Sequence, residues 1–344
     1  MIRRVIAALA LLAASGCDGA ELGPFRLTPF AWLGADSGVA AIPTWPQVSA
    51  RHPAGYRVVV PQPGSSGFAP LAFDDGGNFL GVLDPGDRAA EGFERPLFAR
   101  VAPDGTVWVF DAARRALVFD AARRYLRTVR LPVAPWDAAF LADGRIALTS
   151  STFAAPQQWL LVDAAGRQVR SVGEATPGLP SPRRIVAGNG GEIWTVTMTH
   201  RFVVEAWDTA GRWLRRFDQA PEWFAPYDRL DAPGPDRPPQ PAVQGIWLGA
   251  DGRLWVLGKV ADPEWASGLV PVMNGTASIL RPDDAFDTVL EVRDPATGAV
   301  IAAARFDRLY PFAVEPGVAM RPLVIEGGWF RAELTEVVAI TEGH

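Results

Sequence analysis

The sequence predicts an all-β protein: a six-bladed β-propeller of four-stranded antiparallel blades, preceded by a lipoprotein signal peptide. Three observations lead to this prediction. A tight turn followed by a strand recurs along the chain, aspartates recur at the spacing of a propeller blade, and a short apolar run near the N-terminus ends at a single cysteine. Hydrophobic residues make up 49% of the 344 positions, which is enough for a large core.

Residues 1–17 have the layout of a secretion signal. Arg3 and Arg4 supply a positive segment, and the apolar run at residues 5–14 is shorter than the roughly 20 residues that span a bilayer. Small residues then precede Cys17, which resembles the lipobox of bacterial lipoproteins, where the cysteine is diacylated and becomes the mature N-terminus. We therefore expect lipidation at Cys17 and attachment to a membrane through acyl chains; an ordinary secretory signal is the alternative. As the only cysteine, Cys17 excludes an internal disulfide.

A tight turn followed by an apolar strand recurs four times. The turns are Asp-Gly or Gly-Gly pairs that begin at Asp104, Asp143, Gly190 and Asp251. Glycine accepts the positive φ that a two-residue hairpin demands, so each pair predicts two antiparallel strands. Three of the four strands that follow carry a tryptophan: Trp108, Trp194 and Trp255. We expect these side chains to fill the core between blades, with ligand stacking as the alternative.

The length of the repeat comes from aspartates that end a later strand of each unit. They are Asp74, Asp120, Asp163, Asp208 and Asp294. The first three gaps are 46, 43 and 45 residues, which matches a blade of about 40–50 residues. The last gap is 86 residues and contains irregular segments at 233–241 and 262–284. We interpret it as one blade enlarged by two insertions; a seventh, degenerate blade is the alternative.

The propeller is expected to occupy residues 55–344 as a single domain, after a linker and N-terminal segment at 18–54. A proline precedes four of the expected inner strands: Pro96, Pro135, Pro182 and Pro241. Residues 337–340 form an apolar closing strand. We expect residues 56–60 to complete the same blade from the other end of the chain, which would remove an exposed sheet edge.

The order of proline, inner strand, Asp-Gly turn, tryptophan strand and a Phe-Asp-x-x-Gly-Arg-like turn resembles the NHL-type six-bladed propeller family over about residues 55–342. The resemblance implies the architecture and says little about function. Six-bladed propellers include metal-dependent sugar-lactone hydrolases, whose calcium is held in the central channel by oxygen ligands. The candidate oxygen ligands in this sequence are Asp137 and Asn189. Because Asn189 lies beside a Gly-Gly pair, a structural role in the turn is its alternative.

Motifs for catalysis are missing from the sequence. The three histidines, His52, His200 and His344, do not have metal-ligand spacing, and neither HExxH nor Gly-x-Ser-x-Gly occurs. The net charge is -5 and no basic run interleaves with aromatics, so we expect no nucleic-acid partner. We assign no catalytic residue and no resident metal or cofactor. Calcium in the channel is the alternative.

Two groups of residues are candidates for binding a ligand. Residues that begin the inner strands should meet around the channel mouth: Trp136, Asp137, Arg183, Arg184 and Gln244. Adjacent guanidinium groups suit an anionic ligand, although a solvated pair matched with surface acids is also consistent. Trp223 and Tyr227 lie in the insertion at 220–241, where they could stack on a sugar, clamp a peptide or cover the blade.

We therefore expect a lipid-anchored propeller of the bacterial cell envelope, on its periplasmic or extracellular face. Its expected role is non-enzymatic binding or scaffolding of a protein, peptide or glycan. The alternative is a metal-dependent hydrolase or lyase of the sugar-lactonase type, with its site at the channel mouth around Asp137. The sequence leaves the oligomeric state open.

Overall fold

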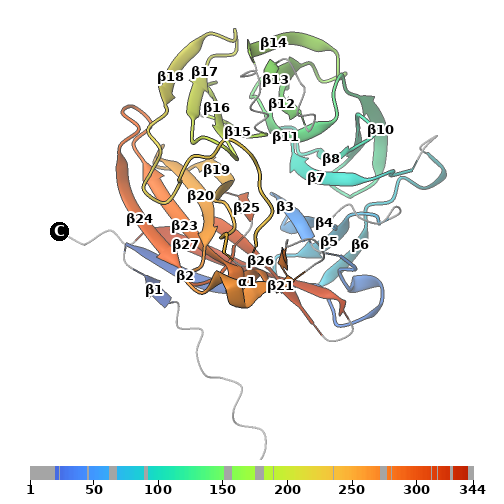
Figure 1. Ribbon diagram of the computed structural model, residues 1–344. Coiled ribbons are helices and arrows are strands. Elements are labelled where there is room, and N and C mark those ends of the chain that lie inside the picture. The colour runs from blue at the N-terminus through green and yellow to red at the C-terminus, as the bar shows by residue number, and fades with distance from the viewer. Residues whose placement is uncertain are drawn as a thin grey trace, which may run out of the picture.

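The protein is a ring of six antiparallel β-sheets around a central axis, as the computed structural model shows (Figure 1). The prediction of a six-bladed propeller is confirmed. The structure describes residues 20–22, 24–44, 46–61, 68–88, 92–150, 157–174, 182–188, 190–234, 236–271, 277–279, 281–310, 312–315, 317–325 and 328–339. No helix in these ranges is long and apolar enough to cross a bilayer.

Each of the first five blades is a meander of four strands, with its first strand nearest the axis. Blade 1 contains β3 (Pro46–His52), β4 (Tyr56–Pro61), β5 (Leu71–Asp74) and β6 (Phe79–Val82). Blade 2 contains β7 (Pro96–Val101), β8 (Val107–Asp111), β9 (Arg115–Phe119) and β10 (Tyr125–Arg130). Blade 3 contains β11 (Pro135–Phe140), β12 (Ile146–Ser150), β13 (Gln157–Val162) and β14 (Gln168–Glu174).

The remaining three blades come from the second half of the chain, and blade 6 also includes two strands from near the N-terminus. Blade 4 contains β15 (Arg183–Ala187), β16 (Ile193–Thr197), β17 (Val204–Trp207) and β18 (Trp213–Phe217). Blade 5 contains β19 (Ala242–Leu248), β20 (Leu254–Ala261), β23 (Phe286–Arg293) and β24 (Val300–Phe306). Blade 6 contains β25 (Phe312–Glu315), β26 (Val318–Val324), β27 (Phe330–Ala339), β2 (Phe25–Leu33) and β1 (Ala20–Leu22).

The 86-residue gap is one blade with insertions, as the sequence indicated, so the seven-bladed alternative is wrong. The first insertion, 218–241, joins β18 to β19. The second, 262–285, joins β20 to β23 and contains η3 (Trp265–Gly268), β21 (Leu269–Pro271), β22 (Ala277–Ile279) and α1 (Pro282–Ala285). Both lie on one face of the ring, which we call the insertion face. The Asp-Gly turns lie on the opposite face, which we call the turn face. Two further 3-10 turns are η1 (Gly38–Ala40) and η2 (Gly86–Arg88).

The ring closes through β2, which corrects one prediction. Residues 56–60 do not complete the last blade, because β4 pairs with β3 and β5 inside blade 1. Instead β2 pairs with β27, from Phe25 opposite Ala339 to Leu33 opposite Ala332. Figure 1 shows β1 and β2 in blue beside the red β27. The propeller therefore begins well before residue 55, and both β2 and β3 lie in the segment expected to be a linker.

Alternation of side chains explains why β2 serves as a closing strand. Phe25 and Leu27 pack in the core between blades 5 and 6, and Leu33 packs between blades 6 and 1, while Arg26 and Trp32 are exposed. Side chains alternate along each half of β2, and the register shift between Pro29 and Ala31 moves the buried residues from the face toward blade 5 to the face toward blade 1. Pairing with β2 also covers the edge of β27, which would otherwise offer unpaired backbone groups.

Apolar clusters between neighbouring blades form the core. Trp108 packs with residues of blades 2 and 3, Trp194 with residues of blades 4 and 5, and Trp255 with residues of blades 5 and 6. Each is less than 10% exposed, which confirms them as core residues. Large aromatic side chains bury much apolar surface, so they stabilise the packing of one blade on the next.

The recurring aspartates fix the turns between third and fourth strands. Asp163 accepts hydrogen bonds from the backbone N–H (2.9 Å) and Nε (2.7 Å) of Arg167. Asp208 accepts the same two bonds from Arg212, at 2.8 and 2.6 Å. The hydrogen bonds from the backbone N–H groups hold the pKa values of both carboxyls below their usual value. The aspartates whose recurrence indicated the fold thus stabilise these turns.

Candidate functional site

A cavity of about 550 Å³ lies in the central channel. The inner strand of every blade contributes one polar residue to its lining; in blade order they are Arg51, Arg100, Asp137, Arg184, Gln244 and Glu315. Pro53, Pro103 and Gly105 also line it, and they belong to turns between first and second strands, so the cavity reaches the turn face. Its volume is in the range of small-molecule sites.

Bulges in the inner strands help to aim side chains at the axis. The ladder between β11 and β12 shifts register between Pro135 and Asp137, and that between β19 and β20 shifts between Val243 and Gly245. The extra residues at these shifts are Trp136 and Gln244. A bulge bends its strand and redirects a side chain, and it is often found beside functional sites. The ladder of β15 has no such shift over Arg183–Ala187.

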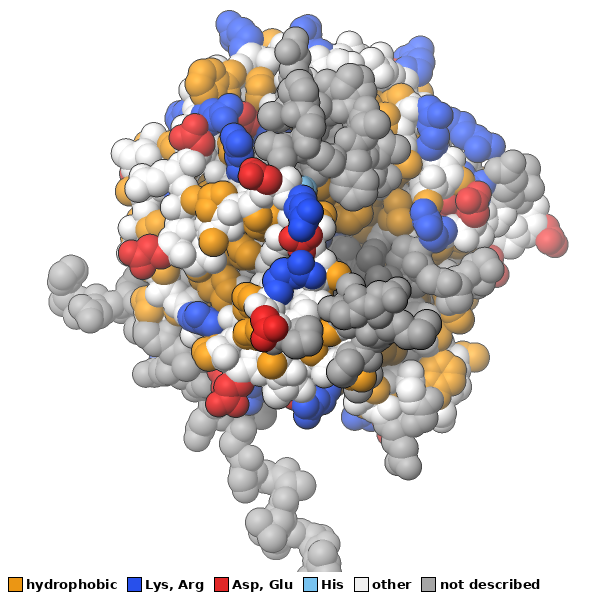
Figure 2. Space-filling model, viewed as in Figure 1, with side chains coloured by type: hydrophobic (Ala, Val, Ile, Leu, Met, Phe, Trp, Pro, Cys, Tyr) orange, Lys and Arg blue, Asp and Glu red, His pale blue; other side chains and the backbone are white. Residues whose placement is uncertain are grey.

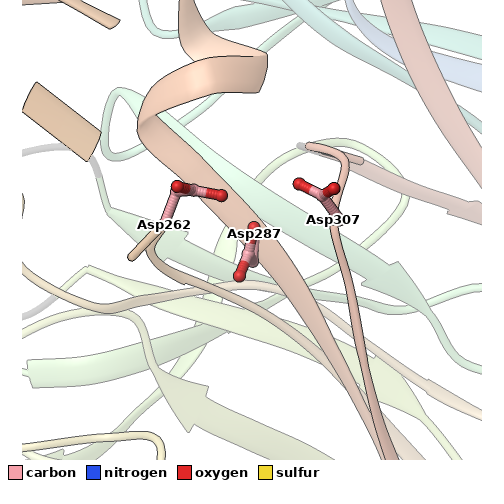
Figure 3. A group of neighbouring side chains, drawn as sticks. All are labelled: Asp262, Asp287 and Asp307. Atoms are coloured by element: carbon pink, nitrogen blue, oxygen red, sulfur yellow. The ribbon is translucent and has the colours of Figure 1, made fainter. Parts of the chain in front are cut away.

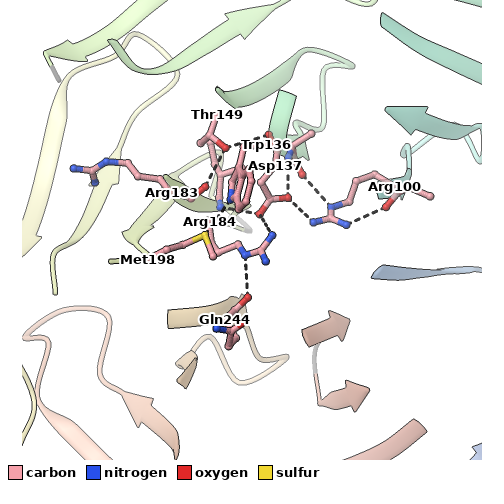
Figure 4. Close-up of polar contacts among 11 residues, drawn as sticks. Arg100, Trp136, Asp137, Thr149, Arg183, Arg184, Met198 and Gln244 are labelled. Carbon is pink, nitrogen blue, oxygen red and sulfur yellow. Dashed lines mark hydrogen bonds and ion pairs between the residues drawn. The ribbon is translucent and has the colours of Figure 1, made fainter. Parts of the chain in front are cut away.

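Asp137 is the centre of the polar network in the cavity (Figure 4). Its carboxylate is 4% exposed and accepts hydrogen bonds from Nη2 of Arg100 and from the N–H groups of Ala138 (2.8 Å) and Ile185 (3.3 Å). Nη1 of Arg184 lies 3.9 Å from its Oδ2. Both carboxylate oxygens therefore already face donors, and a metal ion at Asp137 would have to compete with two guanidinium groups.

Arg184 is held by three neighbours. Its Nε donates to the backbone carbonyl of Gln244 at 2.9 Å, and its guanidinium lies 6.0 Å from the ring centre of Trp136. Burial lowers the pKa of Arg184, an effect that Asp137 opposes and the nearby Arg100 reinforces. The indole N–H of Trp136 donates to the sulfur of Met198 at 3.0 Å. These contacts fix Arg184 in an orientation toward the axis.

Arg183 does not join this group. Alternation along β15 sends its side chain away from Asp137, to the other face of the strand (Figure 4). There its Nη1 pairs with Oε2 of Glu205 at 2.8 Å. Its backbone carbonyl accepts from the hydroxyl of Thr149 at 3.0 Å. The structure thus brings Trp136, Asp137, Arg184 and Gln244 together and separates Arg183 from them. Binding of a ligand at any of them stays a prediction.

Trp223 and Tyr227 lie away from the cavity, in the first insertion. Nε1 of Trp223 donates to Oε1 of Glu291 at 2.8 Å, and the hydroxyl of Tyr227 donates to the carbonyl of Pro241 at 3.1 Å. Both rings pack on the core cluster of blades 4 and 5. Gly258 permits the approach of Trp223, because a Cβ there would lie 2.4 Å from the ring. These contacts favour a covering role; ligand stacking stays a prediction.

On the other side of the cavity the charges are matched one to one. Arg51 donates to both carboxylate oxygens of Asp75, at 3.2 and 2.9 Å. The buried Arg57 lies 2.8 Å from Glu315. Hydrogen bonds from Arg51 hold the pKa of Asp75 below its usual value. These pairs are neutral, so the side of Arg100 and Arg184 is where charge is unbalanced.

The lining and its supporting pairs contain four guanidinium groups and three carboxylates among the described residues. The uncompensated positive charge belongs to Arg100 and Arg184, which share the single carboxylate of Asp137. A guanidinium has several donors in a planar fork, so such a pair can accept a second anion. Figure 2 presents the insertion face, opposite the turn face that the cavity reaches; basic and acidic side chains lie next to one another near its centre.

Sequence reasoning missed several polar residues of the molecule. Arg100 and Glu315 line the cavity but lie near the ends of their strands, whereas the prediction considered only strand beginnings. Asp262, Asp287 and Asp307 form an acidic group on blade 5, and their separation in sequence gave no motif. Two predicted residues, Cys17 and Asn189, lie outside the described residues.

Comparisons with known proteins support the fold and leave function open. No protein-family model matches the chain, and no curated protein matches it. A Bacteroides thetaiotaomicron protein of unknown function has a similar solved structure, with a TM-score of 0.51 and 10% identity over 91% of this chain and 76% of that one. At this identity the likeness extends to the fold alone.

Two other solved structures are similar at lower scores. A protein of unknown function from Bacteroides caccae has a TM-score of 0.47 and 14% identity, covering 76% of this chain and 82% of that one. A Lactobacillus plantarum protein has a TM-score of 0.44 and 14% identity, covering 78% and 85% respectively.

Proposed function

We propose that the chain is a non-enzymatic binding module that holds a carboxylate-bearing segment of a glycan or peptide in its central channel. The observation that carries this proposal is the pairing of two guanidinium groups, Arg100 and Arg184, with one carboxylate in a cavity of about 550 Å³. An incoming carboxylate would supply the missing negative charge. Gln244 and apolar lining residues such as Val186 and Trp247 would contact the rest of the ligand.

The proposal includes the cell envelope as the place of action, with an NHL-type propeller anchored by lipid on Cys17. Ala20 begins β1, the outermost strand of blade 6. A lipid attached three residues earlier would reach about 10 Å from this rim. The anchor would then hold the ring at its edge and leave the channel open to a ligand.

The hydrolase alternative requires a metal ion at the channel mouth. The contacts of Asp137 favour the binding role instead, because its oxygens accept from Arg100 and two backbone N–H groups. A cation placed there would meet two guanidinium groups at close range, which opposes its binding.

The test is a thermal-shift screen of soluble protein lacking residues 1–17. Oligogalacturonates are compared with neutral galacto-oligosaccharides, and glutamate-rich peptides with their glutamine equivalents. An acidic ligand at about 100 times its Kd should raise Tm by about 5 °C, and the neutral counterpart at the same concentration should raise it clearly less. Arg184→Gln should remove this difference between the two ligands. Arg212→Gln, at an 81% exposed side chain in an outer turn, should retain it.

Two outcomes would contradict the proposal. One is a panel in which no acidic ligand raises Tm more than its neutral counterpart. The other is an acidic ligand whose shift survives unchanged in Arg184→Gln. Calcium-dependent hydrolysis of a sugar lactone by the wild-type protein would establish the enzymatic alternative.

A further inference from the structure

Three aspartates meet at the insertion-face end of blade 5. Asp262 directly follows β20, Asp287 is the second residue of β23, and Asp307 directly follows β24. These strands are consecutive in the sheet, and their register pairs Val260 with Asp287 and Thr288 with Phe306. The sheet therefore brings together three residues that the sequence separates by an insertion and a hairpin.

The three carboxylates lie close enough together to hold one cation. One oxygen from each lies within 4.8 Å of those from the other two. Figure 3 shows Asp287 between Asp262 and Asp307, with the carboxylates directed toward a common space. Calcium binds oxygens at about 2.3–2.6 Å, so ligands on opposite sides of the ion are about 5 Å apart. The three carboxylates fit within this span, and calcium accepts several carboxylate ligands more readily than magnesium, which usually keeps several waters.

A second observation distinguishes this group from an ordinary acidic surface. Asp287 is only 4% exposed, and its Oδ1 has no hydrogen-bond partner among the described residues. The other oxygen, Oδ2, accepts from Nε of Arg305 at 2.5 Å. A buried carboxylate oxygen without a donor is costly, and such atoms usually have a partner. Oδ1 is the atom that a cation would contact.

The net negative charge of the group also favours a bound cation. Arg305 pairs with Asp287 and donates to the carbonyl of Ala261, so it balances one of the three carboxylates. Asp262 is oriented by the N–H of Glu264, which donates to its Oδ1 at 2.5 Å. A further carboxylate, that of Glu264, is exposed nearby. The two remaining negative charges match one divalent ion.

We propose that Asp262, Asp287 and Asp307 bind one calcium ion at the base of the second insertion. Asp262 and Asp287 flank this insertion, and the N–H of Asp262 donates to the carbonyl of Ala285 at 3.1 Å, so its two ends already lie together. The ion would clamp both ends of the insertion to β24 and stabilise its closure. None of the three residues lines the channel cavity, so this site is independent of the proposed function.

A proton shared between Asp262 and Asp287 is the competing explanation for the close carboxylates. Burial, and secondarily the neighbouring Asp262, raise the pKa of Asp287, while Arg305 opposes this rise. A shared proton would satisfy the orphan oxygen without a metal. The two explanations differ in whether calcium added at neutral pH binds the protein and raises its Tm.

The experiment is calorimetric titration of calcium into metal-depleted protein lacking residues 1–17, with Tm measured in EDTA and in calcium. We expect one calcium per chain, saturation by about 1 mM and a higher Tm with calcium. Asp287→Asn should abolish binding, and the exposed Asp307→Asn should weaken it at least tenfold. Asp218→Asn, at a 69% exposed aspartate that begins the first insertion, serves as the matched control and should bind as wild type.

Absence of heat and of any Tm change at about 10 mM calcium would overturn the proposal and leave the shared proton as the explanation. Unchanged binding in both Asp287→Asn and Asp307→Asn would also overturn it. Because Asp307 is exposed, its variant should fold even where Asp287→Asn does not. Circular dichroism in EDTA identifies a folding defect, so Asp307→Asn then decides the outcome.

Discussion

At the scale of single residues, the direction of a side chain decided which candidates reach the channel. The sequence identified Trp136, Asp137, Arg184 and Gln244 correctly as neighbours, because inner strands begin around one axis. It could not separate Arg183 from Arg184, since a shift of one residue moves every side chain of a strand to the other face. Bulges in β11 and β19, which have no marker in the sequence, add to this uncertainty.

Lys259, the chain's only lysine, gives a prediction at this scale. Its Nζ lies 4.2 Å from the ring centre of Phe286, and burial lowers its pKa to about 8. Below about pH 8 the folded protein holds the charged ammonium of Lys259 in a buried position, which lowers its stability. The unfolded chain retains the proton up to about pH 10.4, so stability rises as pH increases from 8 toward 10.

Lys259→Met should therefore raise the free energy of unfolding at pH 7 by about 1–2 kcal/mol, after the loss of the contact with Phe286. The gain over wild type should shrink between pH 8 and 10, where folded wild type loses the proton. Urea unfolding of both proteins across this pH range measures it. A difference that stays constant with pH would contradict the assignment.

At the scale of elements, the strands inside the repeat were predictable and the closing strand was not. Asp-Gly turns and recurring aspartates mark local hairpins, whose partners lie a few residues away. β2 carries neither marker, and its partner β27 is about 300 residues distant. The acidic group of blade 5 was missed for the same reason, because strand register and not spacing brings its members together.

The role of β2 predicts losses of stability of very different size at two adjacent residues. Leu33 is fully buried in the cluster between blades 6 and 1, and Trp32 is 45% exposed. Leu33→Ala should cost about 2–5 kcal/mol of unfolding free energy, and Trp32→Ala less than about 1. Urea unfolding gives both values. Equal losses would show that β2 does not close the ring with the described register.

At the scale of the whole molecule, the ring places one polar residue from each blade around a single cavity. No blade alone forms the site: Arg100, Asp137 and Arg184 come from blades 2, 3 and 4. The fold hosts many unrelated activities, so only the chemistry of the site argues for a function. Here that chemistry is an excess of guanidinium groups, which is the basis for proposing an anionic ligand.

The most direct measurement is a thermodynamic cycle that combines one change in the ligand, its amidation, with one change in the protein, Arg184→Gln. Calorimetry compares the best acidic ligand with its amide, on wild-type protein and on Arg184→Gln. If the ligand carboxylate binds Arg184, the amide should bind wild type at least tenfold more weakly, and Arg184→Gln should bind both forms equally. This result is a coupling of at least about 1.4 kcal/mol. The same loss on amidation in both proteins would contradict a channel site for the anion.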